Sequence, residues 1–206
     1  MDLNNLSELI FRNNKCKKPA LFLDRDGVLI KDCHYISNSD DVVLEKGSKG
    51  LVRFAYDQGW IIVIISNQSG ISRKILSWEN YFDITNKMIS LFGEPNPFNA
   101  IYANSEVPNS KNIYWRKPSP NMILRAAKIL NIDLKNSIII GDRKSDILAG
   151  INSGIKLLVH TKTGHGALER EEVIKIKNEI KKYNKVKFIT INDFSQFPNK
   201  FLYKIS

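Results

Sequence analysis

Residues 21–29 read Leu21-Phe22-Leu23-Asp24-Arg25-Asp26-Gly27-Val28-Leu29, a short apolar run followed by two carboxylates and a turn glycine. Side chains two residues apart on an extended backbone share one side, so Asp24 and Asp26 are predicted to face one site. Two ionised carboxylates about 4 Å apart repel each other by roughly 4 kcal/mol at an effective dielectric near 20. A bound metal, a shared proton or a wide separation would relieve this repulsion. Taken alone, the pattern also fits ordinary turn chemistry at a strand end.

Two further apolar runs end in polar residues in the same way. Residues 60–65 are a continuous apolar run that ends at Ser66-Asn67-Gln68-Ser69-Gly70, and residues 137–140 end at Gly141-Asp142. Continuous β-branched runs are typical of strands that are buried on both faces of a parallel sheet. Ligands bind at the carboxyl ends of strands in open α/β sheets, so these strand ends predict one shared site.

Four motifs resemble, in order and spacing, those of the haloacid dehalogenase (HAD) superfamily of phosphohydrolases. They are Asp24-Arg25-Asp26-Gly27-Val28, Ser66-Asn67, Lys117, and Gly141-Asp142 through Asp146. The sequence around them, including Arg116-Lys117-Pro118 and the segment 158–164, is similar to that of one branch of this superfamily. That branch contains D-glycero-D-manno-heptose 1,7-bisphosphate 7-phosphatase and histidinol-phosphate phosphatase. The resemblance covers residues 19–166.

The resemblance implies an α/β fold, a Rossmann-like three-layer sandwich around a central parallel sheet. Residues 1–18 are predicted to be an N-terminal extension and residues 19–206 a single phosphatase domain. A chain of 206 residues that is 43% apolar can bury a substantial core. The intervals 26–66 and 66–117 have room for loops, single strands and predicted helices at 47–57 and 77–92. No separate cap domain is therefore expected.

The resemblance also implies a mechanism for hydrolysing a phosphomonoester. Asp24 would be the nucleophile that forms an aspartyl-phosphate, which divides one hard displacement into two easier ones. Asp26 would serve as general acid and then as general base. Ser66 would donate a hydrogen bond to the phosphoryl oxygens, and Lys117 would place positive charge against them.

The remaining acidic residues suit Mg²⁺, which prefers hard oxygen ligands. The expected ligands are the side chains of Asp24 and Asp142 and the backbone carbonyl of Asp26. Asp146 is expected to support the site by orienting the water shell of the metal or Lys117. Asp142 could instead be a turn former after Gly141, and Asp146 could simply favour the start of a helix.

Substrate recognition is expected from loops around these motifs. Relatives contact the sugar or imidazole end of their substrate where this chain has residues 32–35. The residues expected to bind substrate are Asp32, His34, Tyr35, Asn67, Gln68, Ser69, Arg116 and Arg143.

One feature of the resembling branch is missing from the sequence. In the heptose phosphatases, three cysteines and a histidine in the loop before Arg-Lys-Pro hold a structural zinc. The corresponding residues 102–116 contain neither cysteine nor histidine. Tetrahedral zinc sites need nitrogen and sulfur ligands, so no zinc is expected. Packing, with Tyr114 and Trp115 as anchors, is expected to hold this loop instead.

The charge of the chain limits the expected class of binding partner, and its targeting signals limit the expected location. The formal net charge is +10, but the basic residues are spread along the chain without an evident aromatic and basic groove. A small anionic substrate is therefore favoured over nucleic acid. The sequence indicates no membrane segment or signal peptide, and its two cysteines fit a reducing compartment, so a cytoplasmic location is expected. The oligomeric state stays open.

Three hypotheses remain. The first is a Mg²⁺-dependent phosphatase of a small phosphorylated metabolite: a sugar bisphosphate such as a heptose bisphosphate of surface polysaccharide synthesis, or else histidinol phosphate. The second is a polynucleotide 3′-phosphatase, whose binding to DNA ends would depend on salt. The third is an inactive phosphate-binding protein, against which the intact Asp24, Asp26, Lys117 and Asp142 argue.

Overall fold

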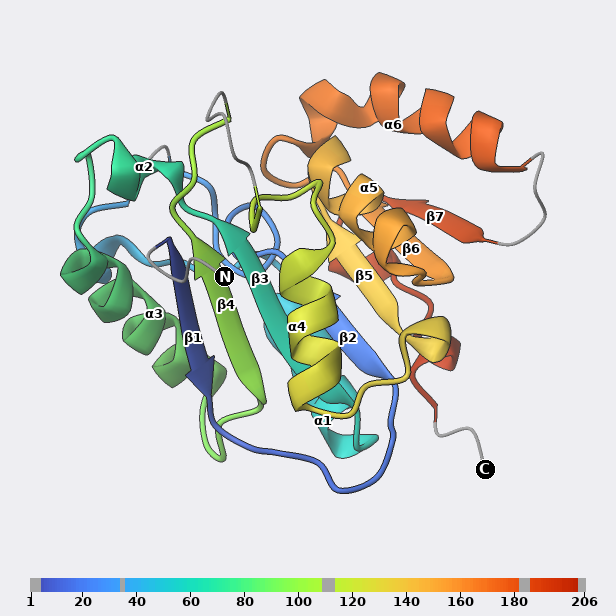
Figure 1. Cartoon of the computed structure of the whole chain (residues 1–206), viewed down its shortest axis with the longest axis horizontal. Coiled ribbons are helices and arrows are strands. Elements are labelled where there is room, and N and C mark those ends of the chain that lie inside the picture. The colour runs from blue at the N-terminus through green and yellow to red at the C-terminus, as the bar shows by residue number, and fades with distance from the viewer. Residues whose placement is uncertain (1–4, 34–35, 109–113, 182–185, 204–206) are drawn as a thin grey trace.

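A seven-stranded sheet forms the centre of the molecule (Figure 1). The computed structural model describes residues 5–33, 36–108, 114–181 and 186–203. The strands are β1 (Leu6–Ile10), β2 (Ala20–Leu23), β3 (Ile61–Asn67), β4 (Ala100–Asn104), β5 (Ile138–Gly141), β6 (Leu157–Thr161) and β7 (Lys187–Ile191). The helices are α1 (Ser48–Asp57), α2 (Ser69–Ser72), α3 (Trp78–Phe92), α4 (Asn121–Ile129), α5 (Lys144–Ser153) and α6 (Gly166–Lys181). Short 3₁₀ helices are η1 (Ser39–Asp41), η2 (Leu134–Asn136), η3 (Phe194–Gln196) and η4 (Asn199–Phe201).

The strand order is β1-β4-β3-β2-β5-β6-β7, in which β2 to β7 are parallel and β1 is antiparallel to β4. The chain runs from β2 to β3 on one side and later returns to place β5 on the other side of β2. The sheet therefore has its topological switch point at the carboxyl end of β2, the position where open α/β sheets bind ligands. The predicted α/β class with a central, mostly parallel sheet is confirmed.

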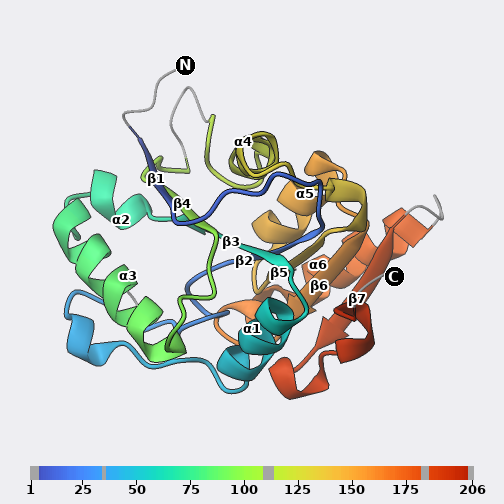
Figure 2. The same cartoon turned by 90° about the horizontal axis from the view of Figure 1, so that it is seen from below.

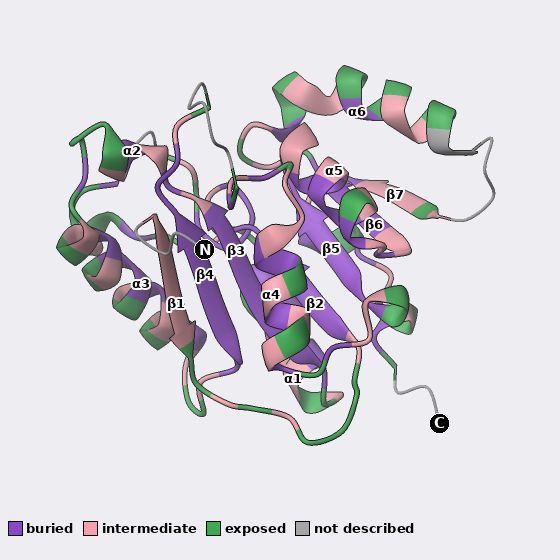
Figure 3. Cartoon of the chain, viewed as in Figure 1, coloured by how far each residue is buried: buried purple, intermediate pink, exposed green. Residues whose placement is uncertain are grey.

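Helices cover both faces of the sheet and give the molecule three layers (Figures 2 and 3). A hydrophobic cluster fills the space between sheet and helices on each face. One face packs against α1 and α3, with Leu51 and Met88 among the buried side chains. The other packs against α4, α5 and α6, with Ile123, Ile147 and Val173 in the cluster. Alternate residues of β2 and β3 belong to opposite clusters, which explains why their sequences are continuously apolar.

The edge strand β1 comes from the N-terminal segment. Its five residues pair with Ala100 to Asn104 of β4, and Glu8 forms an ion pair with Arg125 of α4. Just before β1, the carbonyl of Asn5 accepts a hydrogen bond from the amide of Ser105. The sequence had not indicated this pairing, which joins residues about a hundred positions apart.

Local sequence signals set the helix boundaries. The α3 helix begins after a capping box in which Ser77 Oγ accepts from the amide of Asn80, and it ends at Gly93. Gly47 precedes α1 with a left-handed φ of 84°. Between Asp26 and Lys117, the described residues hold η1, these two helices, β3, the single-turn α2, β4 and connecting segments. No helix of the described chain has the length and hydropathy needed to cross a bilayer.

Candidate active site

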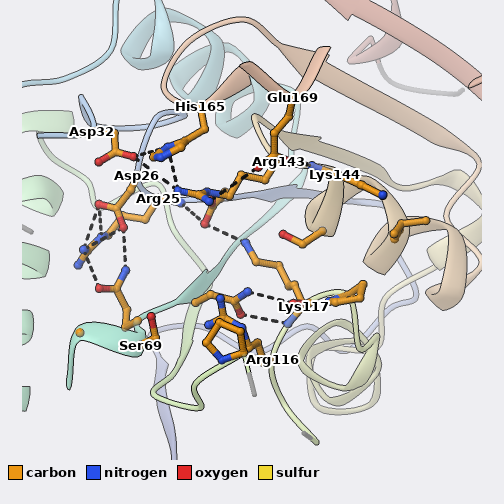
Figure 4. Close-up of a pocket in the computed structure, with 18 of the residues that line it drawn as sticks. Arg25, Asp26, Asp32, Ser69, Arg116, Lys117, Arg143, Lys144, His165 and Glu169 are labelled. Atoms are coloured by element: carbon orange, nitrogen blue, oxygen red, sulfur yellow. Dashed lines mark hydrogen bonds and ion pairs between the residues drawn. The ribbon is translucent and has the colours of Figure 1, made fainter. Parts of the chain in front are cut away.

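A pocket of about 730 Å³ opens at the carboxyl ends of the parallel strands (Figure 4). The side chains that line it come from the ends of β2, β3 and β5, from the loops that follow β4 and β6, and from α2, α5 and α6. Charged lining residues are Asp24, Arg25, Asp26, Asp32, Arg73, Arg116, Lys117, Arg143, Lys144, Glu169 and Glu172. The pocket therefore combines acidic and basic groups at the topological switch point.

Lys117 forms the charged centre of the pocket floor. Its Nζ atom lies 2.9 Å from Asp24 Oδ1 and 2.6 Å from Asp146 Oδ1, and it donates to the carbonyl of Ile65 at 2.8 Å. Burial alone would lower the pKa of Lys117, but the carboxylates of Asp146 and Asp24 raise it above its ordinary value. The ammonium therefore stays charged although it is buried. A lysine is seldom buried unless such partners are present.

Three buried carboxylates crowd around this floor. Oxygen atoms of Asp24, Asp142 and Asp146 all lie within 4.8 Å of one another. Burial raises the pKa of Asp24 to about 7, against the opposing ammonium of Lys117, and the neighbouring carboxylates of Asp146 and Asp26 add to the rise. Burial and the carboxylates of Asp24 and Asp146 raise the pKa of Asp142 well above its usual range. One ammonium does not neutralise three carboxylates, so the cluster favours a further cation.

Asp142 is the carboxylate best placed to hold that cation. Its Oδ2 accepts from the amide of His165 at 2.7 Å, whereas its buried Oδ1 has no hydrogen-bond partner among the described residues. A buried carboxylate oxygen without a donor is costly unless an ion or water satisfies it. All the donors in the cluster are hard carboxylate oxygens, the ligand type that Mg²⁺ prefers. The residues present therefore fit a magnesium ion.

Two glycines make room for the Asp142 carboxylate. Gly27 and Gly164 have φ angles of 76° and 53°, and a Cβ on either would lie within 2.5 Å of Asp142 Oδ2. Both positions need a left-handed backbone and a close approach that other residues do not allow. The glycine of the Asp-Arg-Asp-Gly motif thus has a packing role at this carboxylate.

Asp26 is held by donors from two neighbouring residues. Arg25 Nε donates to its Oδ1 and Arg25 Nη2 to its Oδ2, both at 3.1 Å, and Gln68 Nε2 donates to Oδ2 at 2.7 Å. Gln68 Nε2 also donates to Ser66 Oγ at 2.7 Å, and its Oε1 accepts from Arg25 Nη2 at 3.1 Å. Arg25 in turn stacks on the ring of Tyr81, 4.9 Å from its centroid. The orientation of Asp26 is therefore determined by the side chains of Arg25 and Gln68.

Asn67 holds the backbone of Lys117. Its Nδ2 donates to the Lys117 carbonyl at 3.1 Å, and its Oδ1 accepts from the Lys117 amide at 3.0 Å. Asn104, at the end of β4, donates to the same Oδ1 at 2.7 Å. These bonds connect the ends of β3 and β4 to the lysine of the pocket floor.

The loop from β4 to α4 is held by a carboxylate as well as by packing. Glu106 accepts hydrogen bonds from the amides of Tyr114, Trp115 and Arg116. Trp115 is fully buried, as expected of an anchor, but Tyr114 is 46% exposed. The contribution of Glu106 was not expected from the sequence.

A second charged group lies on the pocket wall around His165 (Figure 4). His165 Nδ1 lies 2.7 Å from Asp32 Oδ2 and 2.8 Å from Arg143 Nη2, so it either donates to the first or accepts from the second. Glu169 Oε1 lies 3.8 Å from Arg143 Nη1. This group places both signs of charge opposite Arg116.

The structure brings most of the sequence-predicted site residues together. Asp24, Asp26, Asp32, Asn67, Gln68, Ser69, Arg116, Lys117 and Arg143 line the pocket. Ser66, Asp142 and Asp146 are buried directly behind its lining, where they contact Gln68, His165 and Lys117. The predictions for His34 and Tyr35 lie outside the described residues.

The geometry adds residues that the sequence reasoning had not placed in the site, among them Arg25, Asn104, Glu106 and His165. Arg25 lies inside the first motif and could have been found by asking what balances two adjacent carboxylates. His165 directly follows Gly164 of the resembling segment 158–164. No local pattern distinguishes Asn104 or Glu106 from ordinary loop residues.

Comparison with known proteins agrees with this fold. Residues 114–181 match the family model described as HAD-hydrolase-like. The chain belongs to the HAD-like phosphatases. It is 37% identical over 183 residues to D-glycero-alpha-D-manno-heptose-1,7-bisphosphate 7-phosphatase of Photorhabdus laumondii. That alignment covers 82% of this chain and 95% of the relative.

Two further relatives give the same family. D-glycero-beta-D-manno-heptose-1,7-bisphosphate 7-phosphatase of Helicobacter pylori strain 26695 is 41% identical over 140 residues, 66% of this chain and 80% of the relative. The crystal structure of D,D-heptose 1,7-bisphosphate phosphatase from B. bronchiseptica, complexed with magnesium and phosphate, superposes with a TM-score of 0.69 at 25% identity. That match covers 76% of this chain and 87% of the other.

Proposed function

We propose that this phosphatase depends on Mg²⁺ and hydrolyses a small phosphorylated sugar, first of all D-glycero-D-manno-heptose 1,7-bisphosphate at its 7-phosphate. The observation that carries the proposal is the contact of Lys117 Nζ with Asp24 at 2.9 Å, beside the carboxylate cluster at the pocket floor. An anionic nucleophile, a fixed ammonium and a cation-binding cluster are the groups that phosphoryl transfer needs in one place. The names of the relatives support the choice of sugar.

In the proposed reaction, an Asp24 oxygen attacks phosphorus and the bond from phosphorus to the sugar oxygen breaks. Asp26 gives its proton to that leaving oxygen. In the second step Asp26 takes a proton from water, the water oxygen attacks phosphorus, and the bond to Asp24 breaks to release inorganic phosphate. Lys117 stabilises the charge on the phosphoryl oxygens in both steps.

The metal would be held by the side chains of Asp24 and Asp142 and the backbone carbonyl of Asp26, with Asp146 positioning Lys117. When bound, Mg²⁺ supplies positive charge that lets an anionic nucleophile approach an anionic phosphoryl group. The orphaned Asp142 Oδ1 and the raised pKa of Asp24 support this assignment. Ser66, Asn67, Gln68 and Ser69 are proposed to surround the phosphoryl group.

The substrate is proposed to carry a second anionic group. Four basic side chains line the pocket beyond Lys117 and Arg25, namely Arg73, Arg116, Arg143 and Lys144. Arginine and lysine side chains bind phosphate through charge-assisted hydrogen bonds. Asp32 and Glu169 on the same wall suit sugar hydroxyl groups as acceptors, and they also favour histidinol phosphate, with its ammonium group, as the second candidate.

A phosphate-release assay tests the proposal. We expect the fastest release from the heptose bisphosphate, and we expect EDTA to abolish it. Other substrates to compare are single sugar phosphates, histidinol phosphate and an oligonucleotide with a 3′-phosphate. Asp24→Asn should lower kcat by about a thousandfold or more, because it removes the attacking anion. The exposed Asp57→Asn in α1 is the matched control and should keep full activity.

Two outcomes would contradict the proposal. If no ester is cleaved, or if Asp24→Asn is as active as the wild type, the protein is not a phosphatase of this mechanism. If the oligonucleotide is the best substrate and its cleavage is strongly salt-dependent, the substrate is nucleic acid.

We also propose a cytoplasmic location, which the exposed, unpaired Cys16 and Cys33 support.

A further inference from the structure

Glu106 binds three successive backbone amides with one buried carboxylate. The residue is 6% exposed and follows β4 at the side of the pocket. Its Oε2 accepts from the amides of Trp115 at 2.9 Å and Arg116 at 2.8 Å, and the Tyr114 amide lies 3.2 Å from both of its oxygens. Successive amides that converge in this way form an anion-binding concavity. The glutamate side chain fills it.

The same glutamate also fixes the side chain of Arg116. Arg116 Nη1 donates to the backbone carbonyl of Glu106 at 3.0 Å. The backbone amide and the guanidinium of Arg116 are thus both tied to one residue. Arg116 lines the pocket (Figure 4). The two bonds to Glu106 therefore help to determine where Arg116 lies in the pocket.

A second set of bonds extends from Glu106 to Lys117. The amide of Glu106 donates to Asn104 Oδ1 at 3.1 Å, and Asn104 Nδ2 donates to Asn67 Oδ1 at 2.7 Å. That oxygen accepts the amide of Lys117 at 3.0 Å. Glu106 therefore holds the segment that ends at Lys117 from both sides, through Arg116 directly and through Asn104 and Asn67.

We propose that Glu106 is a positioning residue whose carboxylate sets the place of Arg116 and Lys117 in the pocket, and that through Arg116 it determines affinity for the second anionic group of the substrate. The inference rests on the proposed function, which assigns a binding role to Arg116. Packing of the buried Trp115 fixes one side of these residues, but it does not orient three amides. Charge-assisted bonds to the Glu106 carboxylate do, and by holding the Arg116 amide they set the position from which its guanidinium reaches the pocket.

Steady-state kinetics with two substrates separate this role from simple stabilisation. We expect Glu106→Ala to raise KM for the sugar bisphosphate by about tenfold or more, the cost of misplacing a charged hydrogen-bonding group. KM for p-nitrophenyl phosphate, which has no second anionic group, should change little. Both substrates should lose kcat to a similar extent, through Lys117. Glu106→Gln, which keeps one acceptor oxygen, should recover part of the loss.

Two controls complete the design. Glu8→Gln neutralises another glutamate, which pairs with Arg125 away from the pocket, and should affect stability without separating the two KM values. In the Arg116→Ala background, Glu106→Ala should raise KM for the bisphosphate no further, because both changes act through the same guanidinium.

Amide hydrogen exchange gives a readout that does not depend on turnover. In Glu106→Ala, the amides of Tyr114, Trp115 and Arg116 should exchange about ten times faster than in the wild type, whereas those of β5 should not. Unchanged exchange, or equal KM changes for both substrates, would overturn the inference. If the wild type leaves the bisphosphate intact while the exchange result holds, the proposed substrate is wrong and the assignment of Glu106 to this loop stands, without its role in affinity.

Discussion

At the scale of the residue, the clearest arrangement is the pair of side chains that hold Asp26. Arg25 presents two nitrogens to the carboxylate, and Gln68 adds a third donor at 2.7 Å. Arg25 is 3% exposed and rests on Tyr81, so its guanidinium has little freedom to turn. A planar fork of this kind fixes the direction of a carboxylate, which a flexible ammonium does not.

We therefore expect Arg25→Lys to keep the positive charge and lose the orientation of Asp26. If Asp26 moves the proton in both proposed steps, kcat should fall about tenfold or more while KM changes little, because one charge-assisted hydrogen bond is worth roughly 1.5–3 kcal/mol. Initial-rate measurements on the bisphosphate would check this.

Arg53→Lys is the matched control. Arg53 donates to the carbonyls of Phe92 and Pro95, outside the residues that line the pocket. Its substitution should leave both kinetic constants unchanged. Equal kcat values for the two variants would show that the fork on Asp26 does not matter for turnover.

At the scale of the element, β1 extends the sheet beyond β4 and supports the loop that carries Glu106. Leu9 packs against one hydrophobic cluster and Leu6 against the other, whereas Ile10 at the end of the strand is 42% exposed. We expect Leu9→Ala to lower the free energy of unfolding by about 1–2 kcal/mol, less than for a fully buried leucine. Ile10→Ala should cost less than about 0.5 kcal/mol. Urea denaturation of both variants measures the difference, and equal losses would mean that β1 is not packed as described.

The elements also show how far the sequence could predict the fold. The apolar runs that become β3 and β5 are local, and they predict these strands nearly to the residue, while the helix predicted at 77–92 begins one residue later as α3. The β1 strand could not be recognised, because its five residues show no clear alternation and its partner β4 lies about a hundred residues away. Pairing between distant segments depends on the assembled sheet.

The same distinction holds for the site. The order of the four motifs predicted that Asp24, Lys117 and Asp142 would lie together, since parallel strands deliver their ends to one edge. Glu106 acts through a contact with the backbone amide of Arg116, and Asn104 acts through a contact with the side-chain amide of Asn67. No residue type or spacing signals such contacts, so only the folded chain reveals them.

At the scale of the whole molecule, the net charge of +10 is not concentrated in the pocket. Among the described residues, the lining contains six basic side chains and five acidic ones, and several of them form pairs. A pocket with both signs of charge favours specific contacts with a small molecule over attraction of a polyanion. This balance agrees with the choice of a sugar bisphosphate as the first candidate substrate.

The carboxylate cluster links metal binding to the stability of the entire fold. Asp24, Asp142 and Asp146 converge only in the folded chain, so an ion that binds them stabilises the folded state by mass action. At a Mg²⁺ concentration of about 100 times Kd this amounts to roughly 2.7 kcal/mol, or about 5–10 °C in Tm for a chain of this size. We expect Asp142→Asn to abolish this shift, because it replaces the orphaned Oδ1 ligand, and to be at least as stable as the wild type without magnesium. Asp57→Asn should keep the shift, and thermal denaturation with and without Mg²⁺ measures all three proteins. An undiminished shift in Asp142→Asn would place the magnesium elsewhere.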